Sequence, residues 1–243
     1  MTARLLEVAA NSLASALAAQ AGGAGRIELC TALEAGGLTP SHGEIALVRE
    51  QVALPLYVLI RPRAGDFLYS PQELATMHRD IEACAALGCD GVVLGVLDAD
   101  GQVDGARCSE LVAAAGRMGI TFHRAFDLVP DQSTALEAVI ALGAERVLTS
   151  GGRRSALEGA GQIRRLIDQA AGRVGVMPGA GIQAGNIASL VQQSGAREYH
   201  ASAKRVLPSR MRHQPADELD MIGGETRTGA DEVRRLVHAL ANA

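Results

Sequence analysis

Aromatic residues are scarce in this chain: tryptophan is absent, and aromatic residues make up only 2% of its 243 residues. Basic residues are not in excess either, since 23 Lys and Arg stand against 27 Asp and Glu, for a formal net charge of −4. Proteins that bind nucleic acid usually present a basic face, and many stack aromatic rings on bases. We therefore expect no nucleic-acid partner.

Cysteines and long apolar runs are also few. Four cysteines in a chain of this length do not make a disulfide scaffold. No stretch approaches the ~20 apolar residues that a membrane span requires. The N-terminal segment reaches the carboxylate of Glu7 too early for the apolar core of a secretory signal. We expect a cytoplasmic protein with reduced thiols and no membrane partner.

Short apolar runs alternate with longer amphipathic runs along the whole chain, without a linker or a shift in composition. This pattern predicts a single domain over residues 1–243, with eight strands. The predicted strands are Leu5–Ala9, Arg26–Leu29, Leu56–Ile60, Gly91–Gly95, Ile120–Phe122, Arg146–Thr149, Val174–Met177 and Glu198–Ala201. Ser41, Ser70 and Ser155 each precede a Glu by three residues, which is typical of a helix start, and Asn11 is a candidate cap for the first helix.

Eight strand–helix units in about 250 residues predict an α/β fold, a (β/α)8 TIM barrel with a closed parallel sheet. The alternative is an open doubly wound sheet, which usually has a glycine-rich turn after its first strand. Here that turn reads Ala9-Ala10-Asn11-Ser12, without glycine. The segment 204–229 follows the eighth strand and has no clear periodicity. We expect a long loop there, which would act as a lid over the barrel opening.

Active sites of such barrels lie at the C-terminal ends of the strands. On strands one, two, three and eight, six polar residues stand at or near these ends: Glu7, Glu28, Arg61, Arg63, His200 and Ser202. Closure of the barrel would bring Glu7, Glu28, Arg61 and His200 together. This group is either functional, with Glu7 and Glu28 as catalytic carboxylates and Arg61 and His200 as substrate-binding residues, or a structural ion-pair network. The functional interpretation is favoured, because internal ion pairs contribute little net stability.

Strand five ends in His123 and Arg124, followed by Asp127. A histidine at this place is suited to general acid–base catalysis, and Asp127 would orient it. The alternative is a histidine that is hydrogen-bonded in the core. We expect His123, Arg124 and Asp127 to belong to the catalytic group.

Glycine-rich turns follow strands six and seven and expose backbone N–H groups that can bind an anion. The residues concerned are Ser150, Gly151, Gly179, Ala180 and Gly181. With the nearby arginines, they predict a small anionic ligand at the mouth of the barrel. The alternative is that these glycines only form tight turns.

Several segments in order along residues 4–204 resemble the CutC copper-homeostasis family. The segments are Glu28-Leu29-Cys30, Gly36-Gly37-Leu38-Thr39-Pro40-Ser41, Arg61-Pro62-Arg63-Ala64-Gly65-Asp66-Phe67, Gly95-Val96-Leu97-Asp98, Thr121-Phe122-His123-Arg124-Ala125-Phe126-Asp127, Leu148-Thr149-Ser150-Gly151 and Gly179-Ala180-Gly181. The resemblance implies a (β/α)8 barrel, a cytoplasmic location, homodimers or higher oligomers, and a Cu(I)-binding role.

Three hypotheses follow for the function. In the first, copper homeostasis, Cu(I) binds through Cys30, which matches the Glu-Leu-Cys of the family, with a Met or His as a further ligand. In the second, the protein is an enzyme that acts on a phosphorylated or carboxylated small molecule by acid–base chemistry. The third, divalent-metal chemistry at Glu7, Glu28, His123 and His200, ranks lower because no H-x-H or H-E-x-x-H spacing is present.

Overall fold

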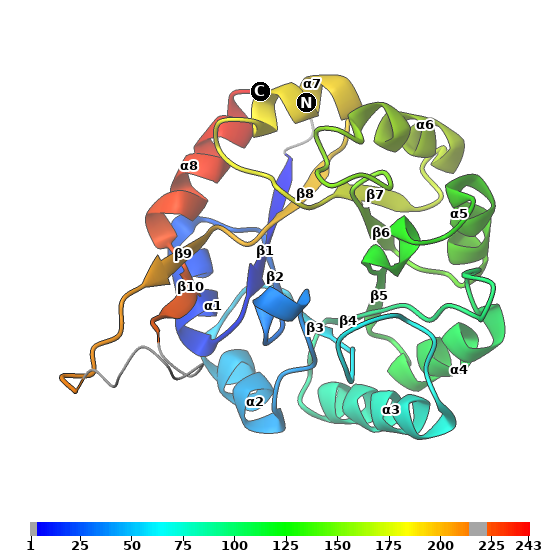
Figure 1. Cartoon of the computed structure of the whole chain (residues 1–243), viewed down its shortest axis with the longest axis horizontal. Coiled ribbons are helices and arrows are strands. Elements are labelled where there is room, and N and C mark those ends of the chain that lie inside the picture. The colour runs from blue at the N-terminus through cyan, green and yellow to red at the C-terminus, as the bar shows by residue number, and fades with distance from the viewer. Residues whose placement is uncertain (1–3, 214–222) are drawn as a thin grey trace.

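The computed structural model describes residues 4–213 and 223–243, and its centre is a ring of eight parallel strands (Figure 1). The strands are β1 (Leu5–Ala10), β2 (Arg26–Leu29), β3 (Leu56–Leu59), β4 (Gly91–Leu94), β5 (Gly119–Phe122), β6 (Arg146–Thr149), β7 (Gly175–Pro178) and β8 (Glu198–Ala201). Their hydrogen-bonded order is β7-β6-β5-β4-β3-β2-β1-β8. A parallel bridge between Gly179 and His200 closes the ring. The predicted (β/α)8 barrel is confirmed, and each predicted strand agrees within one residue at each end.

Helices surround the ring of strands in Figure 1. They are α1 (Leu13–Gly22), α2 (His42–Gln51), α3 (Pro71–Ala86), α4 (Gly105–Ala115), α5 (Gln132–Ala141), α6 (Ala160–Ala170), α7 (Ile187–Ser194) and α8 (Ala230–Ala241), with short 3-10 turns η1 (Leu33–Ala35) and η2 (Arg124–Asp127). Among the residues that the structure describes, no helix combines the length and the apolar character that crossing a bilayer demands.

Two of the predicted helix starts are correct and two are not. The Ser70 hydroxyl accepts from the Glu73 amide and the Glu73 carboxylate accepts from the Ser70 amide, so α3 begins with a full capping box. Ser41 caps α2 through its side chain. Ser155 makes the same local contact with Glu158, but in a turn that ends before α6 begins. The cap of α1 is Ser12, one residue beyond the predicted Asn11.

Strand side chains alternate between an apolar layer outside the ring and a largely polar interior. Outward residues such as Leu6, Val8 and Ile27 are buried against the helices. The interior contains charged residues, together with a small apolar group formed by Cys30, Tyr57, Leu59 and Val93. The charged side chains therefore lie inside the ring, below the opening where a ligand would enter.

The segment 204–229 is not one long loop. It contains two strands, β9 (Lys204–Leu207) and β10 (Glu225–Thr228), which pair antiparallel. β10 packs against α1, and Figure 1 shows the pair extending outward from the ring. The two segments form strands because Lys204–Leu207 and Glu225–Thr228, far apart in the chain, satisfy each other's backbone hydrogen bonds. Lys204, the first residue of β9, lines the cavity at the barrel opening. The expected lid stays a prediction, since residues 214–222 lie outside the described part.

Candidate functional site

A cavity of about 900 Å³ opens at the C-terminal ends of the strands. Ten of the residues predicted for the site line it: Glu28, Cys30, Arg61, His123, Arg124, Asp127, Ala180, Gly181, His200 and Ser202. Five others do not: Glu7, Arg63, Ser150, Gly151 and Gly179. The chemistry-bearing side chains therefore gather around one opening, as the barrel topology requires.

Glu7, Glu28 and His200 form a buried group on three neighbouring strands. The β1–β8 register places Glu7 beside His200, and the ring nitrogen Nδ1 of His200 lies 2.8 Å from Glu7 Oε1. His200 Nε2 lies 4.0 Å from Glu28 Oε1. The side chain of Glu7 is fully buried, and that of Glu28 is 8% exposed. The predicted meeting of these three residues is confirmed.

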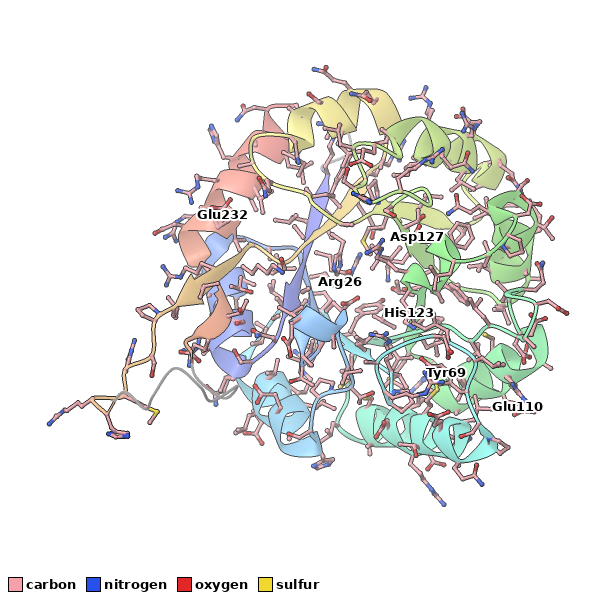
Figure 2. All side chains as sticks on the ribbon, in the orientation of Figure 1. Arg26, Tyr69, Glu110, His123, Asp127 and Glu232 are labelled. Carbon is pink, nitrogen blue, oxygen red and sulfur yellow. The ribbon has the colours of Figure 1, made fainter. Side chains whose placement is uncertain are left out.

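Arg26, rather than Arg61, supplies the positive charge in this group. Figure 2 shows Arg26 inside the ring, where its guanidinium pairs with Glu7 and Glu198. The sequence contained a signal for it, because Arg26 and Glu28 are two residues apart and therefore share one face of β2. Arg26 is the first residue of β2, far from the C-terminal end where active-site residues of such barrels are expected.

Arg61 has a different position from the one expected. Its guanidinium donates to the carbonyls of Ala35, Gly37 and Gly65 and lies 5.0 Å from the centre of the Phe67 ring. Arg61 therefore holds together the loops that follow β2 and β3, while its charge lies at the cavity wall. It does not contact the Glu7 group: its two terminal nitrogens bind these carbonyls, and its Nε is buried without a partner among the described residues.

Arg63 turns outward along its own loop and does not line the cavity. It pairs with Asp66 and Glu73 and donates to the carbonyl of Leu68. These contacts connect the β3 loop to the start of α3.

The carboxyl groups of the buried cluster have opposite pKa shifts. Burial raises the pKa of Glu7, but the hydrogen bond from His200 and the charge of Arg26 outweigh it and lower the pKa to about 2. Burial, with the neighbouring charge of Glu7, raises the pKa of Glu28 to about 7, although His200 opposes this shift. One carboxylate is thus fixed in its charged form, whereas the other gains and loses a proton near neutral pH.

His123 lies inside the ring of strands, as Figure 2 shows, and is neutral at physiological pH. Burial and the charge of Arg61 lower its pKa to about 3. The Ala125 amide donates to Nδ1 over 3.2 Å, so the ring proton must be on Nε2. Nε2 is buried and has no hydrogen-bond partner among the described residues. His123 therefore offers one N–H donor in the cavity wall.

Asp127 does not orient His123, contrary to the prediction. Its carboxylate accepts hydrogen bonds from the amides of Ser150 and Gly152 and from the Thr149 hydroxyl, and it pairs with Arg124. Asp127 thus fills the N–H cradle of the turn after β6. That turn, predicted to bind a substrate anion, already holds a carboxylate of its own chain.

The turn after β7 still has backbone N–H groups that are available to bind an anion. Ala180 and Gly181 both have positive φ, at 86° and 70°. The amides of Gly181 and Ile182 donate to no acceptor within the described part of the chain. Gly179 has a structural role instead. Its amide donates to the Thr149 carbonyl, and the residue forms a β-bridge with His200.

Ser202, at the end of the eighth strand, lines the cavity and its carbonyl accepts from the Thr228 hydroxyl. This bond joins the barrel rim to β10.

Cys30 is the cysteine at the cavity. It is 1% exposed, and burial, with the charges of Glu28 and Glu34, raises its pKa far above the ordinary value. Cys84, Cys89 and Cys108 lie in the apolar layer outside the ring. Within the described residues, the cavity therefore offers one thiol as a soft ligand, and that thiol is protonated until a metal displaces the proton.

Comparison with known proteins gives a consistent result over nearly the whole chain. The model of the CutC family matches residues 4–205. A protein named CutC from Xylella fastidiosa (strain Temecula1) is 58% identical over 236 residues, covering 97% of this chain and 88% of the relative. A mouse protein named as a copper homeostasis protein cutC homolog is 50% identical over 208 residues, covering 86% and 76%.

Solved structures give the same family and fold. The crystal structure of a putative copper homeostasis protein CutC from Streptococcus agalactiae has a TM-score of 0.79 at 32% identity, over 82% of this chain and 98% of the other. A thiamine phosphate pyrophosphorylase from Pyrococcus furiosus, at 15% identity and a TM-score of 0.60 over 98% and 96%, shares the fold. The chain belongs to the CutC family.

Proposed function

We propose that this protein acts in copper homeostasis and carries Cu(I) as a cargo bound to the Cys30 thiolate. The mouse and Streptococcus agalactiae relatives are named for copper homeostasis. The observation on which the proposal depends is the position of Cys30, a buried sulfur in the wall of an open cavity. Cu(I) prefers thiolate ligands, and the cavity leads to one.

The single thiol has a consequence for how copper is held. Cu(I) must displace the proton of Cys30, because burial raises the pKa of this thiol. A second donor is supplied by the molecule that delivers the ion, for which the 900 Å³ cavity has room. His123 does not supply it, because its Nδ1 accepts from Ala125 and its Nε2 carries the proton. Such a site suits exchange of Cu(I) rather than permanent storage.

The first prediction tests this thiol. Replacing Cys30 with Ser should lower Cu(I) affinity at least tenfold, measured anaerobically by competition with a chromogenic Cu(I) chelator in the presence of reduced glutathione. Cys108→Ser is the matched control, because Cys108 is equally buried but lies in the outer layer of α4. Unchanged Cu(I) stoichiometry and affinity in Cys30→Ser would refute the proposal.

A second candidate function is supported by a separate observation, the unpartnered donors of the cavity. His123, Gly181, Ile182 and Lys204 line the cavity, and four of their donors have no acceptor in the described part of the chain: His123 Nε2, the amides of Gly181 and Ile182, and the Lys204 ammonium. They suit a small molecule with a phosphate or carboxylate group. In this alternative, Glu28 transfers the proton, because its pKa of about 7 suits acid–base chemistry, and His123 donates a hydrogen bond.

Inorganic phosphate is the probe for this alternative. Millimolar phosphate should raise the melting temperature of the protein by a few degrees, and His123→Ala should remove that shift, whereas His78→Ala on the exposed face of α3 should not. If the wild-type protein shows no shift relative to chloride at equal ionic strength, the alternative fails.

We also propose a cytoplasmic location and a homodimer or higher homo-oligomer. The four cysteines support the location, since all of them are free and a reducing compartment keeps them so. The oligomer follows from the family resemblance alone. Size-exclusion chromatography with light scattering tests it, and a mass of one 25.2 kDa chain would overturn it.

A further inference from the structure

We propose that the barrel also holds a divalent transition-metal ion between His200 Nε2 and the Glu28 carboxylate, with Glu7 as the residue that positions the imidazole. This site is separate from the Cys30 thiol and does not depend on it. Among the described residues, Glu7, Glu28 and His200 are the group whose possible ligand atoms all lie within 4.8 Å of one another.

The tautomer of His200 supports this assignment. Glu7 forms an ion pair with Arg26 through its Oε2, so its carboxylate accepts a hydrogen bond at Oε1, and the proton of the His200–Glu7 contact belongs to Nδ1. Nε2 therefore offers its lone pair toward Glu28 once a metal replaces any proton there. A carboxylate that accepts from the second ring nitrogen is the common outer partner of metal-binding histidines.

The separation of the two ligands leaves a place for an ion. His200 Nε2 and Glu28 Oε1 are 4.0 Å apart, which is too long for a hydrogen bond. Two ligands about 2.1 Å from a tetrahedral ion lie about 3.4 Å apart. The two side chains would therefore approach each other by about 0.6 Å when an ion binds, a shift within reach of the Glu28 side chain.

An independent observation is the state of the Glu28 carboxylate. Its side chain is 8% exposed, its Oε2 is fully buried without a hydrogen-bond partner, and neither oxygen accepts from a described residue. A buried carboxylate without partners is costly to the fold. Glu28 also lines the cavity, so a bound ion would satisfy its oxygens and keep further coordination positions open to a ligand.

The two histidines of the cavity thus differ in chemistry. His123 has its proton on Nε2 and suits an anion, whereas His200 has its proton on Nδ1 and suits a metal. One nitrogen and a carboxylate favour borderline divalent ions such as Zn²⁺ or Co²⁺ over soft Cu(I). Glu7 itself stays outside the coordination sphere, because both of its oxygens already bind His200 and Arg26.

Isothermal titration of the full chain with Zn²⁺, after removal of metal by a chelator, tests the site. We expect one ion per chain with a micromolar or lower Kd, and at least a tenfold loss of affinity in Glu28→Gln and in His200→Gln. The control is Glu110→Gln on α4, a residue outside the ring of strands in Figure 2. Stoichiometry below 0.2, or equal affinity in all variants, would overturn the proposal.

Spectroscopy separates the positioning role of Glu7 from a merely structural one. The Co²⁺ complex should give visible d–d bands, and Glu7→Gln should keep the bands but shift them and weaken Co²⁺ binding more than fivefold. A folded Glu7→Gln protein with wild-type bands and affinity would refute the role of Glu7. Cys30→Ser should leave Co²⁺ binding unchanged, so failure of this site and failure of the Cu(I) proposal give different results.

Discussion

At the scale of single residues, the functional chemistry depends on which atoms are left without partners. The carboxylate of Asp127 accepts from amides of the turn after β6, and the terminal nitrogens of Arg61 donate to loop carbonyls, although the Nε of Arg61 is buried without a partner. Glu28 and His123 are buried with free polar atoms at the cavity. Such atoms reduce folding stability, and protein sites that bind ligands commonly contain them.

Glu28 gives a prediction for stability against pH. Its pKa of about 7 in the folded chain lies above the ordinary 4.5, so the folded state binds more protons than the unfolded state between these values. The stability contribution of protonated Glu28 is therefore complete below pH 4.5, falls as pH rises from 4.5 to 7, and is absent above pH 7. The wild type should therefore lose up to about 3 kcal/mol of unfolding free energy over this pH range, and Glu28→Gln should not show this loss.

The measurement is chemical denaturation of metal-free protein at pH 5 and at pH 8, in the presence of a chelator. The free energy of unfolding of the wild type should fall more between these two values than that of Glu28→Gln. Glu110→Gln should follow the wild type. A parallel decrease in wild type and Glu28→Gln would contradict the raised pKa.

At the scale of elements, local sequence signals are reliable only where the tertiary structure does not compete with them. The Ser-x-x-Glu pattern at Ser70 begins α3, whereas the same pattern at Ser155 lies in a turn before α6. The strands were predicted within one residue because apolar runs report burial directly. β9 and β10 could not be predicted, since their pairing depends on partners 18 or more residues apart in the chain.

This contrast makes a prediction about the two serines. Ser70→Ala should destabilise the protein by about 1 kcal/mol, because it removes an acceptor for an amide of the first turn of α3. Ser155→Ala should cost less than about 0.5 kcal/mol, since no helix starts there. Urea denaturation of both variants measures the two losses of stability. Equal losses would show that the Ser-x-x-Glu pattern determines the effect, whether or not a helix starts there.

At the scale of the whole molecule, the barrel determines which distant residues meet. The sequence predicted that Glu7, Glu28 and His200 gather, because closure of eight strands puts β8 beside β1. The same reasoning did not identify Arg26, and it placed Arg61 in the group. Side-chain hydrogen bonds to loop carbonyls decide such details, and strand order does not contain that information.

The closure of the ring gives a further prediction. A Cβ added at Gly179 would lie 2.5 Å from Leu148 Cδ1 and 3.5 Å from His200 Cβ, at the bridge between β7 and β8. Gly179→Ala should therefore destabilise the protein by about 1–3 kcal/mol. Gly161→Ala in α6 has open space around its Cβ and should instead stabilise the helix slightly. Thermal unfolding distinguishes the two, and equal melting temperatures would contradict this account of closure.

The carboxylate of Asp127 beside the turn after β6 makes the mouth of the barrel unequal on its two sides. Asp127 lines the cavity, and its negative charge disfavours an anionic group nearby, whereas the unengaged amides of Gly181 and Ile182 attract one. A guest with one anionic end would therefore enter in a single orientation, head toward β7 and tail toward β5. The fold thus imposes a direction on its guest before any chemistry takes place.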